Sequence, residues 1–403
     1  GSQGPRTLTK RFGAWLALAA VLMYALVLRP PLAAVGPLLP IIDEDLGLSL
    51  AQQGFLTAIP VFSFGVGAFA GPALAKRLGL ERSLFWLLAL LTLAIGIRGW
   101  FGFTSLVIGT TVAGLAIAVS NVLLPSVIRG RFSNHVPQVT ALFTTVLAIS
   151  ASIAAASAVP IEGTLGNWNL TLMVWLAPAA LALVLWKLAL KAPVQIDTSP
   201  AEEQPTLSRS ASNDFGLVLR SKVTWAIFGF FGIQSAGFYV LLSWLPTILI
   251  ERGYTAEAAG SLLGLATIVG VPTGLLLASS FAKIKRLDWL AFAVSLVTAA
   301  GFLALEVEQS LLACILIGLG QAATFPLSLT MISTKAAKSV TPTLSATTQG
   351  MGYVFAGIVA FSMAGIRDLT GSWSQGIWII FGLTLAQAYC GFAADRAKAI
   401  STL

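Results

Sequence analysis

A single positive charge, Arg29, lies inside the first long apolar run of the chain. The run extends from Phe12 to Ile42, and no Asp or Glu follows Arg29 before Asp43. A lone cation in the hydrocarbon core of a membrane costs roughly 2.5–3.5 kcal/mol on insertion scales, so an intramembrane charge indicates a functional site. Because a guanidinium presents a rigid planar fork of N–H donors, we expect Arg29 to bind a small anion or a strong hydrogen-bond acceptor.

The position of Arg29 along its helix places it deep in the membrane. At a rise of about 1.5 Å per residue, it lies roughly 27 Å from Arg11 and roughly 21 Å from Asp43. Several prolines follow Arg29. Proline breaks helices, and such breaks at membrane depth usually line a cavity. The alternative to a ligand site is a structural arginine that donates hydrogen bonds to carbonyls of a neighbouring helix. The prolines that follow Arg29 are Pro30, Pro31, Pro37 and Pro40.

Other polar side chains within apolar runs are candidates for the same site. Arg98 lies near the end of the third run, where it serves either an anion access route or the membrane interface. Ser235, Tyr239 and Ser243 recur every four residues and therefore share one face of a helix. The remaining candidates, each of which could equally hold two helices together, are Asn121, Gln234, Trp244, Gln321, Gln349 and Tyr353.

Some kinds of chemistry are missing from the apolar runs. No Asp or Glu lies deep in any of them, so tight proton coupling, which usually needs an ionisable relay in the membrane, is not expected. The single histidine, His135, falls in a polar loop. Motifs for metals, nucleophilic catalysis and ATP are absent, so we expect no enzyme, cofactor or metal. Cys314 and Cys390 are expected to be small apolar residues without a disulfide.

The composition is that of a polytopic membrane protein. Apolar residues make up 57% of the chain and charged residues only 10%, against about 25% charged in soluble domains. Runs long enough to cross a bilayer recur throughout, and we expect all of them to be helices. The twelve predicted spans are approximately 12–42, 50–75, 83–101, 104–128, 137–160, 169–190, 223–250, 258–281, 288–305, 310–333, 343–365 and 374–394.

The distribution of charge predicts how the spans are oriented. A net charge of +8 could indicate a nucleic-acid partner, but most Lys and Arg occur in loops at alternate ends of the spans. The acidic residues gather in the other loops, as at Asp43 and Glu162. By the positive-inside rule, both termini are expected in the cytoplasm.

A polar segment divides the spans into two sets of six. Residues 191–222 are rich in Pro, Ser and charged side chains, which is typical of a linker. The predicted organisation is an N-terminal six-helix bundle at 1–190, a cytoplasmic linker at 191–222 and a C-terminal bundle at 223–403. The halves repeat at an offset of 206 residues, which matches Gly54 with Gly260 and Gly114 with Gly320. Parallel repeats around a mid-membrane site are typical of alternating-access transporters.

This twelve-span plan with a central linker resembles the major facilitator superfamily. This sequence matches part of the family's signature in the loop after span two, which is Gly-x-x-x-Asp-Arg-x-Gly-Arg-Arg. The segment 72–82 keeps Arg77, Gly79 and Arg82, but Lys76 replaces the Asp. The resemblance implies a gating role for this loop, and the substitution weakens its usual charge contact between helices.

Further strings resemble the cyanate and 2-nitroimidazole transporter branch of that superfamily. They include Arg29-Pro-Pro31, Asn121-Val-Leu-Leu-Pro125, Trp244-Leu-Pro-Thr-Ile-Leu-Ile250 and Gly350-Met-Gly-Tyr353. The resemblance covers nearly the whole chain. It implies a monomeric carrier of a small anion or compact nitro-heterocycle in a bacterial inner membrane, with a cavity lined by spans 1, 4, 5, 7, 10 and 11.

Two other functions compete with this interpretation. Multidrug efflux by proton antiport is the main alternative, but the fifth span, from Pro137 to Pro160, has none of the glycines of that branch's signature. A receptor with an output domain is the other, and the central segment is too short and polar to fold as one. The substrate, the direction of transport and any coupling ion stay open at this stage.

Overall fold

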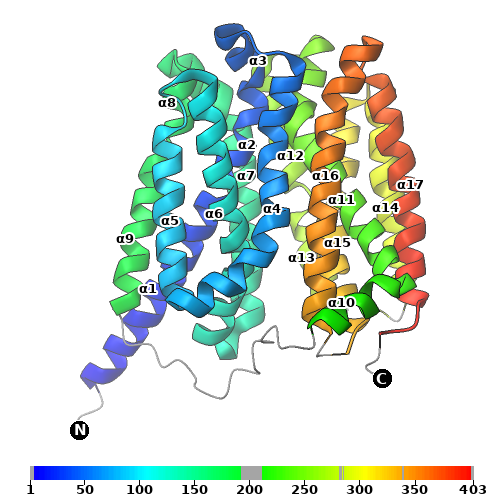
Figure 1. The fold of residues 1–403 in the computed structure, drawn as a ribbon. Helices are drawn as coiled ribbons and strands as arrows, with labels where there is room; N and C mark the ends of the chain where they lie inside the picture. Colours follow the sequence, from blue (N-terminus) through cyan, green and yellow to red (C-terminus); the bar gives the residue numbers. More distant parts are fainter. Residues whose placement is uncertain (1–3, 192–210, 281–283, 285, 338–339, 401–403) are drawn as a thin grey trace.

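The computed structural model describes residues 4–191, 211–280, 284, 286–337 and 340–400. These residues form helices and short connections, and they contain no β-strand, only an isolated bridge between Ala336 and Ile400. The helices stand side by side, with both termini at the same end of the molecule (Figure 1). We call this end the termini side. The all-α fold predicted from the sequence is confirmed.

The N-terminal half is built from helices that run back and forth between the two ends. They are α1 (Gly4–Leu28), α2 (Pro30–Ala33), α3 (Val35–Leu46), α4 (Leu50–Leu78), α5 (Leu80–Ile97), α6 (Gly102–Arg131), the 3-10 helix η1 (Ser133–His135), α7 (Val136–Leu165), α8 (Trp168–Met173) and α9 (Leu176–Lys191).

The C-terminal half repeats this arrangement after an additional short helix. Its elements are α10 (Ala211–Arg220), α11 (Lys222–Glu251), α12 (Ala256–Ile268), α13 (Val271–Ser280), α14 (Leu287–Glu306), α15 (Ser310–Thr334), α16 (Thr341–Thr370) and α17 (Ser374–Arg396).

The helices have the length and composition of membrane spans. Within the described residues, 11 stretches are long and apolar enough to cross a membrane. The number rises to 12 when the two parts of α4, which meet at an angle of 50° between Gly67 and Phe69, are taken as one span. The chain is therefore a multi-pass membrane protein, as the twelve predicted spans indicated.

Three of the predicted spans are interrupted, and for the first of them the prolines after Arg29 had indicated a break. The first divides into α1, α2 and α3, the sixth into α8 and α9, and the eighth into α12 and α13. Prolines account for the first break. Close packing accompanies the third, because a Cβ at Gly270 would lie only 2.1 Å from the carbonyl oxygen of Gly318 on α15.

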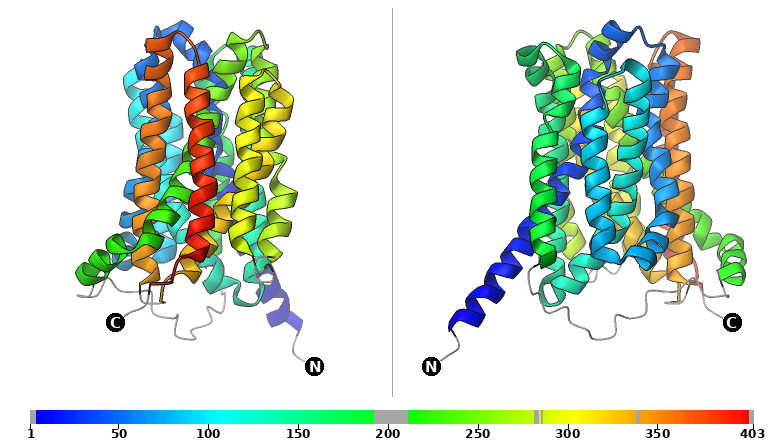
Figure 2. Two further views of the ribbon diagram at one scale, coloured as in Figure 1. Left: turned by 90° about the vertical axis from the view of Figure 1, so that its right-hand side faces the viewer. Right: turned by 60° about the vertical axis from the view of Figure 1, so that its left-hand side comes forward.

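The two halves meet mainly along two helix pairs, α4 with α16 and α7 with α12. The first pair lies side by side in Figures 1 and 2. Glycines permit the second pair to approach closely: a Cβ at Gly260 would lie 2.7 Å from the carbonyl oxygen of Ala155, and one at Gly264 would lie 2.9 Å from that of Ser152. Gly54, the repeat partner of Gly260, packs in the same way against Ala364 of α16.

The repeat also extends to charged contacts on the termini side. Arg131 forms a bidentate salt bridge with Glu81, at 2.5 and 2.7 Å, and donates to the carbonyl oxygen of Ala189 at 3.2 Å. In the other half, Lys335 pairs with the Asp395 carboxylate at 3.4 Å and also donates to the Asp395 carbonyl oxygen. Ala189 and Asp395 are related by the repeat offset, so in each half a basic side chain donates to the carbonyl oxygen at the same repeat position. The paired carboxylates differ, because Glu81 belongs to α5 and Asp395 belongs to α17.

The segment between the halves contains a helix that its polar composition did not predict. Helix α10 lies at the termini side, across the ends of the other helices (Figures 1 and 2). Val218 anchors it, because this side chain is fully buried in an apolar cluster with Val223 and Ile227 of α11. Residues 192–210 lie outside the described part of the chain, and the three-part domain division stays a prediction.

Candidate functional site

The first membrane span is broken at Arg29. This residue is the only one between α1 and α2, and its carbonyl oxygen accepts hydrogen bonds from Leu32 N and Ala33 N, both at 3.0 Å. Pro30 and Pro31 occupy the first positions of α2. Because they lack an N–H, the carbonyls one turn earlier lose their usual helical partners. The local sequence therefore places the Arg29 side chain at a helix break.

Among the described residues, the surroundings of Arg29 contain hydroxyls and no carboxylate partner. Arg29 is half-buried and forms no salt bridge within the described part of the chain. Its guanidinium interacts with the hydroxyl of Tyr239 on α11, and its charge also acts on Tyr353 of α16. Arg29 comes from the N-terminal half and both tyrosines come from the C-terminal half, so the site is shared between the two bundles.

Aromatic rings from three helices form one wall of this site. Phe64 of α4 lies with its ring centroid 5.9 Å from that of Tyr239 and 5.3 Å from that of Tyr353. The two tyrosine rings are 6.4 Å apart, and Phe231 meets Tyr353 edge-on at 5.1 Å. Such a cluster offers ring faces and edges to a flat or apolar ligand.

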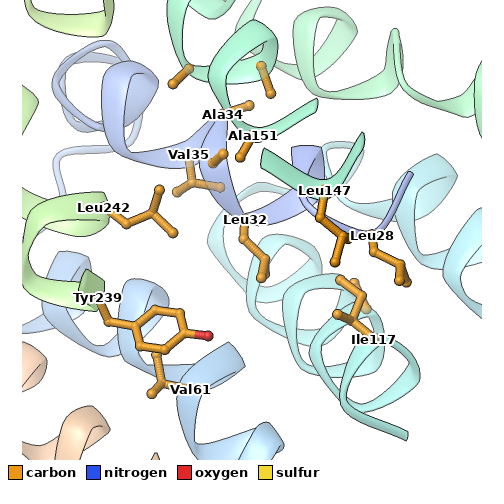
Figure 3. Close-up of a cluster of buried hydrophobic side chains, with 14 of the residues drawn as sticks. Leu28, Leu32, Ala34, Val35, Val61, Ile117, Leu147, Ala151, Tyr239 and Leu242 are labelled. Carbon is orange, nitrogen blue, oxygen red and sulfur yellow. The ribbon is translucent and has the colours of Figure 1, made fainter. Parts of the chain in front are cut away.

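Aliphatic side chains of the N-terminal half pack nearby. In Figure 3 the Tyr239 hydroxyl points away from its own helix toward Leu32, while Val61 lies beside the ring. Leu28, Leu32 and Ile117 are buried in one apolar cluster. This wall supplies no hydrogen-bonding group, so Arg29 and the tyrosines are the polar groups that the structure brings together here.

The predicted glutamines on α11 and α15 are joined by one hydrogen bond, from the side chain of Gln321 to the backbone of Gln234. Gln234 is buried, and its Nε2 donates to Ser235 Oγ at 2.7 Å. Gln321 Nε2 donates to the carbonyl oxygen of Gln234 at 3.2 Å, and Thr324 in turn donates to the Gln321 carbonyl oxygen at 3.0 Å. These bonds tie α11 to α15 within the C-terminal bundle.

Asn121 and Gln349 are half-buried on α6 and α16. Gln349 Nε2 donates to Ser345 Oγ on its own helix at 2.6 Å. The Asn121 amide has no hydrogen bond to another described residue. Neither side chain forms a hydrogen bond with Arg29, so no polar contact among the described residues joins them to the arginine.

Trp244 lies in the packed interior of the C-terminal half. It is fully buried, its Nε1 donates to the carbonyl oxygen of Ala360 at 2.8 Å, and its ring centroid is 5.1 Å from that of Trp373. These contacts join α11 to α16. They place Trp244 among structural contacts, apart from the Arg29 group.

Arg98 is buried, although the simpler expectation from the sequence was a position at the membrane interface. Only 1% of its surface is exposed. Its Nη1 donates to the carbonyl oxygen of Pro31 at 2.7 Å, and its Nε donates to Thr110 Oγ1 at 3.1 Å. A small cavity between the break in the first span and helices α4, α6 and α11 is lined by Arg98 and also by Tyr239 and Ser243.

The residues of the predicted gating loop lie on the surface of the termini side. Lys76, Arg77, Gly79 and Arg82 are all exposed where α4 ends and α5 begins. Gly79 has φ of 84°, a left-handed value that favours glycine at this turn. The neighbouring ion pair is instead the one between Glu81 and Arg131 that closes the N-terminal bundle.

Sequence reasoning missed several residues of the site. Phe64 is one of many apolar residues of α4, and no periodic polar signal distinguishes it. Thr110 pairs with Arg98 across two helices, which a single sequence does not reveal.

Both cysteines are free, as expected. Within the described residues, no three His, Cys, Asp or Glu side chains gather in a group that could hold a metal.

Comparisons with known proteins point to one family. The family model described as Major Facilitator Superfamily matches residues 15–361. The 2-nitroimidazole transporter of Escherichia coli (strain K12) is 32% identical over 95% of this chain and 96% of its own. The cyanate transport protein CynX of the same organism is 29% identical, covering 88% of this chain and 91% of its own.

Solved structures agree on the fold. The inward open conformation of the xylose transporter XylE from E. coli superposes with a TM-score of 0.75, at 14% identity over 93% of this chain and 95% of that one. A D-xylose-proton symporter gives a TM-score of 0.73, also at 14% identity, over 97% of this chain and 98% of that one. At such identities the likeness concerns the fold alone.

Proposed function

Because the chain belongs to the Major Facilitator Superfamily of transporters, we propose that it carries a small anion or a compact nitro- or N-heterocyclic compound by alternating access. Arg29 is the anchor for the anionic or acceptor group. The observation that carries the proposal is the position of Arg29 at a helix break, where it interacts with the Tyr239 hydroxyl and has no carboxylate partner among the described residues.

The charge of Arg29 selects the chemical class of the substrate. An unpaired guanidinium at membrane depth is costly, and a bound anion or acceptor oxygen offsets part of that cost. The planar fork can donate two parallel hydrogen bonds to a carboxylate-like or nitro group. A lipophilic cation would meet repulsion at the same place, which disfavours the alternative of cationic drug efflux.

The aromatic wall selects the shape. Phe64 packs against Tyr239 and Tyr353, the two tyrosines on which Arg29 acts, so ring surfaces lie close to the polar group. A flat five-membered ring with an oxygen-bearing substituent would place its face against these rings and its oxygens toward Arg29. The transporters of 2-nitroimidazole and of cyanate among the relatives support this class of substrate.

The division of the site between the halves suggests how binding couples to transport. Arg29 belongs to one bundle, and Tyr239 and Tyr353 belong to the other, so one ligand contacts both. The halves pack tightly on the side opposite the termini, where a Cβ at Gly36 would lie 2.3 Å from the carbonyl oxygen of Leu242. Rocking of the bundles about the ligand would open this side and close the other.

The same proposal includes the membrane setting. The protein is a monomer in a bacterial inner membrane with both termini in the cytoplasm, as the positive-inside rule predicts. Arg98, Asn121, Gln321, Gln234, Gln349 and Trp244 remain predicted contributors to the transport path. Lys76, Arg77, Gly79 and Arg82 remain the predicted gating loop.

A thermal-shift screen tests the function and the site together. Purified protein is titrated with sodium cyanate and with 2-nitroimidazole, in parallel with Arg29→Ala and with Arg220→Ala, an exposed arginine of α10. A ligand of the native state raises the melting temperature. We expect one of the two compounds to stabilise the wild type and Arg220→Ala, but not Arg29→Ala.

Two other results of the screen would contradict the proposed site or the proposed function. Stabilisation that persists in Arg29→Ala would place the binding site elsewhere. Stabilisation by bulky lipophilic cations, unaffected by Arg29→Ala, would favour the efflux alternative.

A further inference from the structure

The cavity beside Arg98 is separate from the position of Arg29 and has its own polar lining. It lies between the break in the first span and helices α4, α6 and α11. Its polar side chains are Arg98, Thr110, Ser243, Tyr239 and Thr57, and its remaining lining is apolar. The space holds about one water-sized group. No Asp or Glu lines it.

Arg98 brings a positive charge into this cavity without a counter-charge. Two of its nitrogens donate to Pro31 O and Thr110 Oγ1, and the rest of the guanidinium has no acceptor among the described residues. The side chain also has no salt bridge there. A buried guanidinium with N–H groups to spare needs an acceptor that carries negative charge or a lone pair.

Two hydroxyls on the cavity wall also have protons to donate. Ser243 is 4% exposed and has no hydrogen-bond partner among the described residues. Thr110 Oγ1 accepts from Arg98 Nε, which leaves its own proton free. Thr57 differs, because its hydroxyl is within hydrogen-bonding distance, 3.2 Å, of the Gln53 and Gly54 carbonyl oxygens of its own helix.

The lining is thus rich in donors and poor in acceptors. We propose that this cavity binds a monovalent anion of halide size, held by Arg98, Ser243 and Thr110. The anion neutralises Arg98 and stabilises the packing of α5 and α6 against the broken first span. This site is distinct from the proposed substrate anchor, because Arg29 does not line the cavity, although Tyr239 both lines it and interacts with Arg29.

The site predicts that halide stabilises the folded protein. Protein is exchanged into sodium gluconate, whose anion is too large for the cavity, and chloride or bromide is then titrated at constant ionic strength. We expect a saturable rise in melting temperature with both halides, since each binds the native state. Arg98→Gln and Ser243→Ala should abolish or strongly weaken it.

Matched variants place the effect at this cavity. Arg29→Gln and the exposed Arg220→Gln should keep the halide response, because neither residue lines the cavity. Ser243→Ala removes only a hydroxyl, so it serves if Arg98→Gln does not fold. Loss of the response in Arg29→Gln, with retention in Ser243→Ala, would show that halide binds at Arg29 and would overturn the proposal.

Crystals grown in bromide give a direct measurement. We expect anomalous density within hydrogen-bonding distance of Arg98 and Ser243 Oγ. A water molecule at that position, or equal melting temperatures in chloride and gluconate, would show that the cavity holds only water. Because no cyanate or nitroimidazole is used, these outcomes are independent of the test of the proposed substrate.

Discussion

Arg98 Nη1 donates a hydrogen bond to the carbonyl oxygen of Pro31, 2.7 Å away, and so ties the end of α5 to the break in the first span. Pro31 is two residues beyond Arg29, in a helix that ends at Ala33. The buried cation therefore supplies a donor to a carbonyl at the break. Fixing this short helix also fixes the backbone from which the Arg29 side chain extends.

The first prediction concerns the second partner of Arg98. Thr110→Val keeps the shape of the side chain and removes the oxygen that accepts from Arg98 Nε at 3.1 Å. A charged donor left without its acceptor should lower the free energy of unfolding by about 1–3 kcal/mol. Thr111→Val is the control, because the Thr111 hydroxyl donates only to Val107 O of its own helix. Equal melting temperatures for the two variants would contradict the role given to Thr110.

The second prediction tests whether Arg29 recognises the ligand through the paired N–H donors of its guanidinium or through its positive charge alone. Arg29→Lys keeps the positive charge and loses the planar pair of donors. We expect the affinity for the ligand identified by thermal shift to fall by about tenfold, which corresponds to about 1.4 kcal/mol. Titration of intrinsic tryptophan fluorescence measures the dissociation constant. An unchanged constant would mean that charge alone is recognised.

The third prediction separates the hydroxyl of Tyr239 from its ring. Tyr239→Phe retains the ring packing with Phe64, whose centroid is 5.9 Å away, and removes the hydroxyl that interacts with Arg29. The variant loses the hydrogen bond that the Tyr239 hydroxyl can make to the ligand. Ligand binding should therefore weaken by about three- to tenfold, with little change in melting temperature.

Tyr24→Phe should give the opposite pattern. The Tyr24 hydroxyl is buried, donates to Leu84 O at 3.0 Å and lies 2.8 Å from Ser120 Oγ, and neither partner belongs to the Arg29 group. We expect a lower melting temperature with unchanged affinity. Weakened binding in Tyr24→Phe but not in Tyr239→Phe would contradict the assignment of Tyr239.

The sequence predicts the fold and part of the site for identifiable reasons. Apolar runs of bilayer length specify helices, because no other element except a closed barrel satisfies the backbone in lipid. The prolines after Arg29 indicate a break, which the structure confirms. The four-residue spacing of Tyr239 and Ser243 indicates a shared face, and both residues line one cavity.

The contacts that sequence reasoning could not supply are those between distant segments. Arg98 reaches Pro31 across 67 positions and Trp244 reaches Ala360 across 116. Nothing in either local sequence identifies its partner. Helix α10 was missed because its anchor, Val218, is stabilised by a cluster formed with other helices rather than by its polar flanks.

The fourth prediction concerns the ion pair between Glu81 and Arg131 on the termini side. Glu81 and Arg131 are half-buried, and their side chains join in a bidentate pair at 2.5 and 2.7 Å. In a double-mutant cycle of Glu81→Gln and Arg131→Gln, we expect a coupling energy of about 0.5–3 kcal/mol from unfolding measurements. Glu44→Gln, at an exposed position, should change stability by less than about 0.5 kcal/mol. Strict additivity of the two single variants would show that the pair contributes no coupling.

The last prediction tests whether close packing of the halves holds the conformation seen here. A Cβ at Gly260 would lie 2.7 Å from the Ala155 carbonyl oxygen, so Gly260→Ala should push α12 away from α7. Overpacking by one methyl group costs about 1–3 kcal/mol, and about 1 kcal/mol shifts a two-state population roughly fivefold.

The shift is read from the labelling rate of a cysteine that replaces Thr57, in a background without Cys314 and Cys390. A membrane-impermeant maleimide applied to the side opposite the termini should react severalfold faster in Gly260→Ala. Gly163→Ala is the matched control, because nothing lies within 4 Å of a Cβ built there. If both glycine variants label at the same rate, contact between α7 and α12 does not keep this side closed.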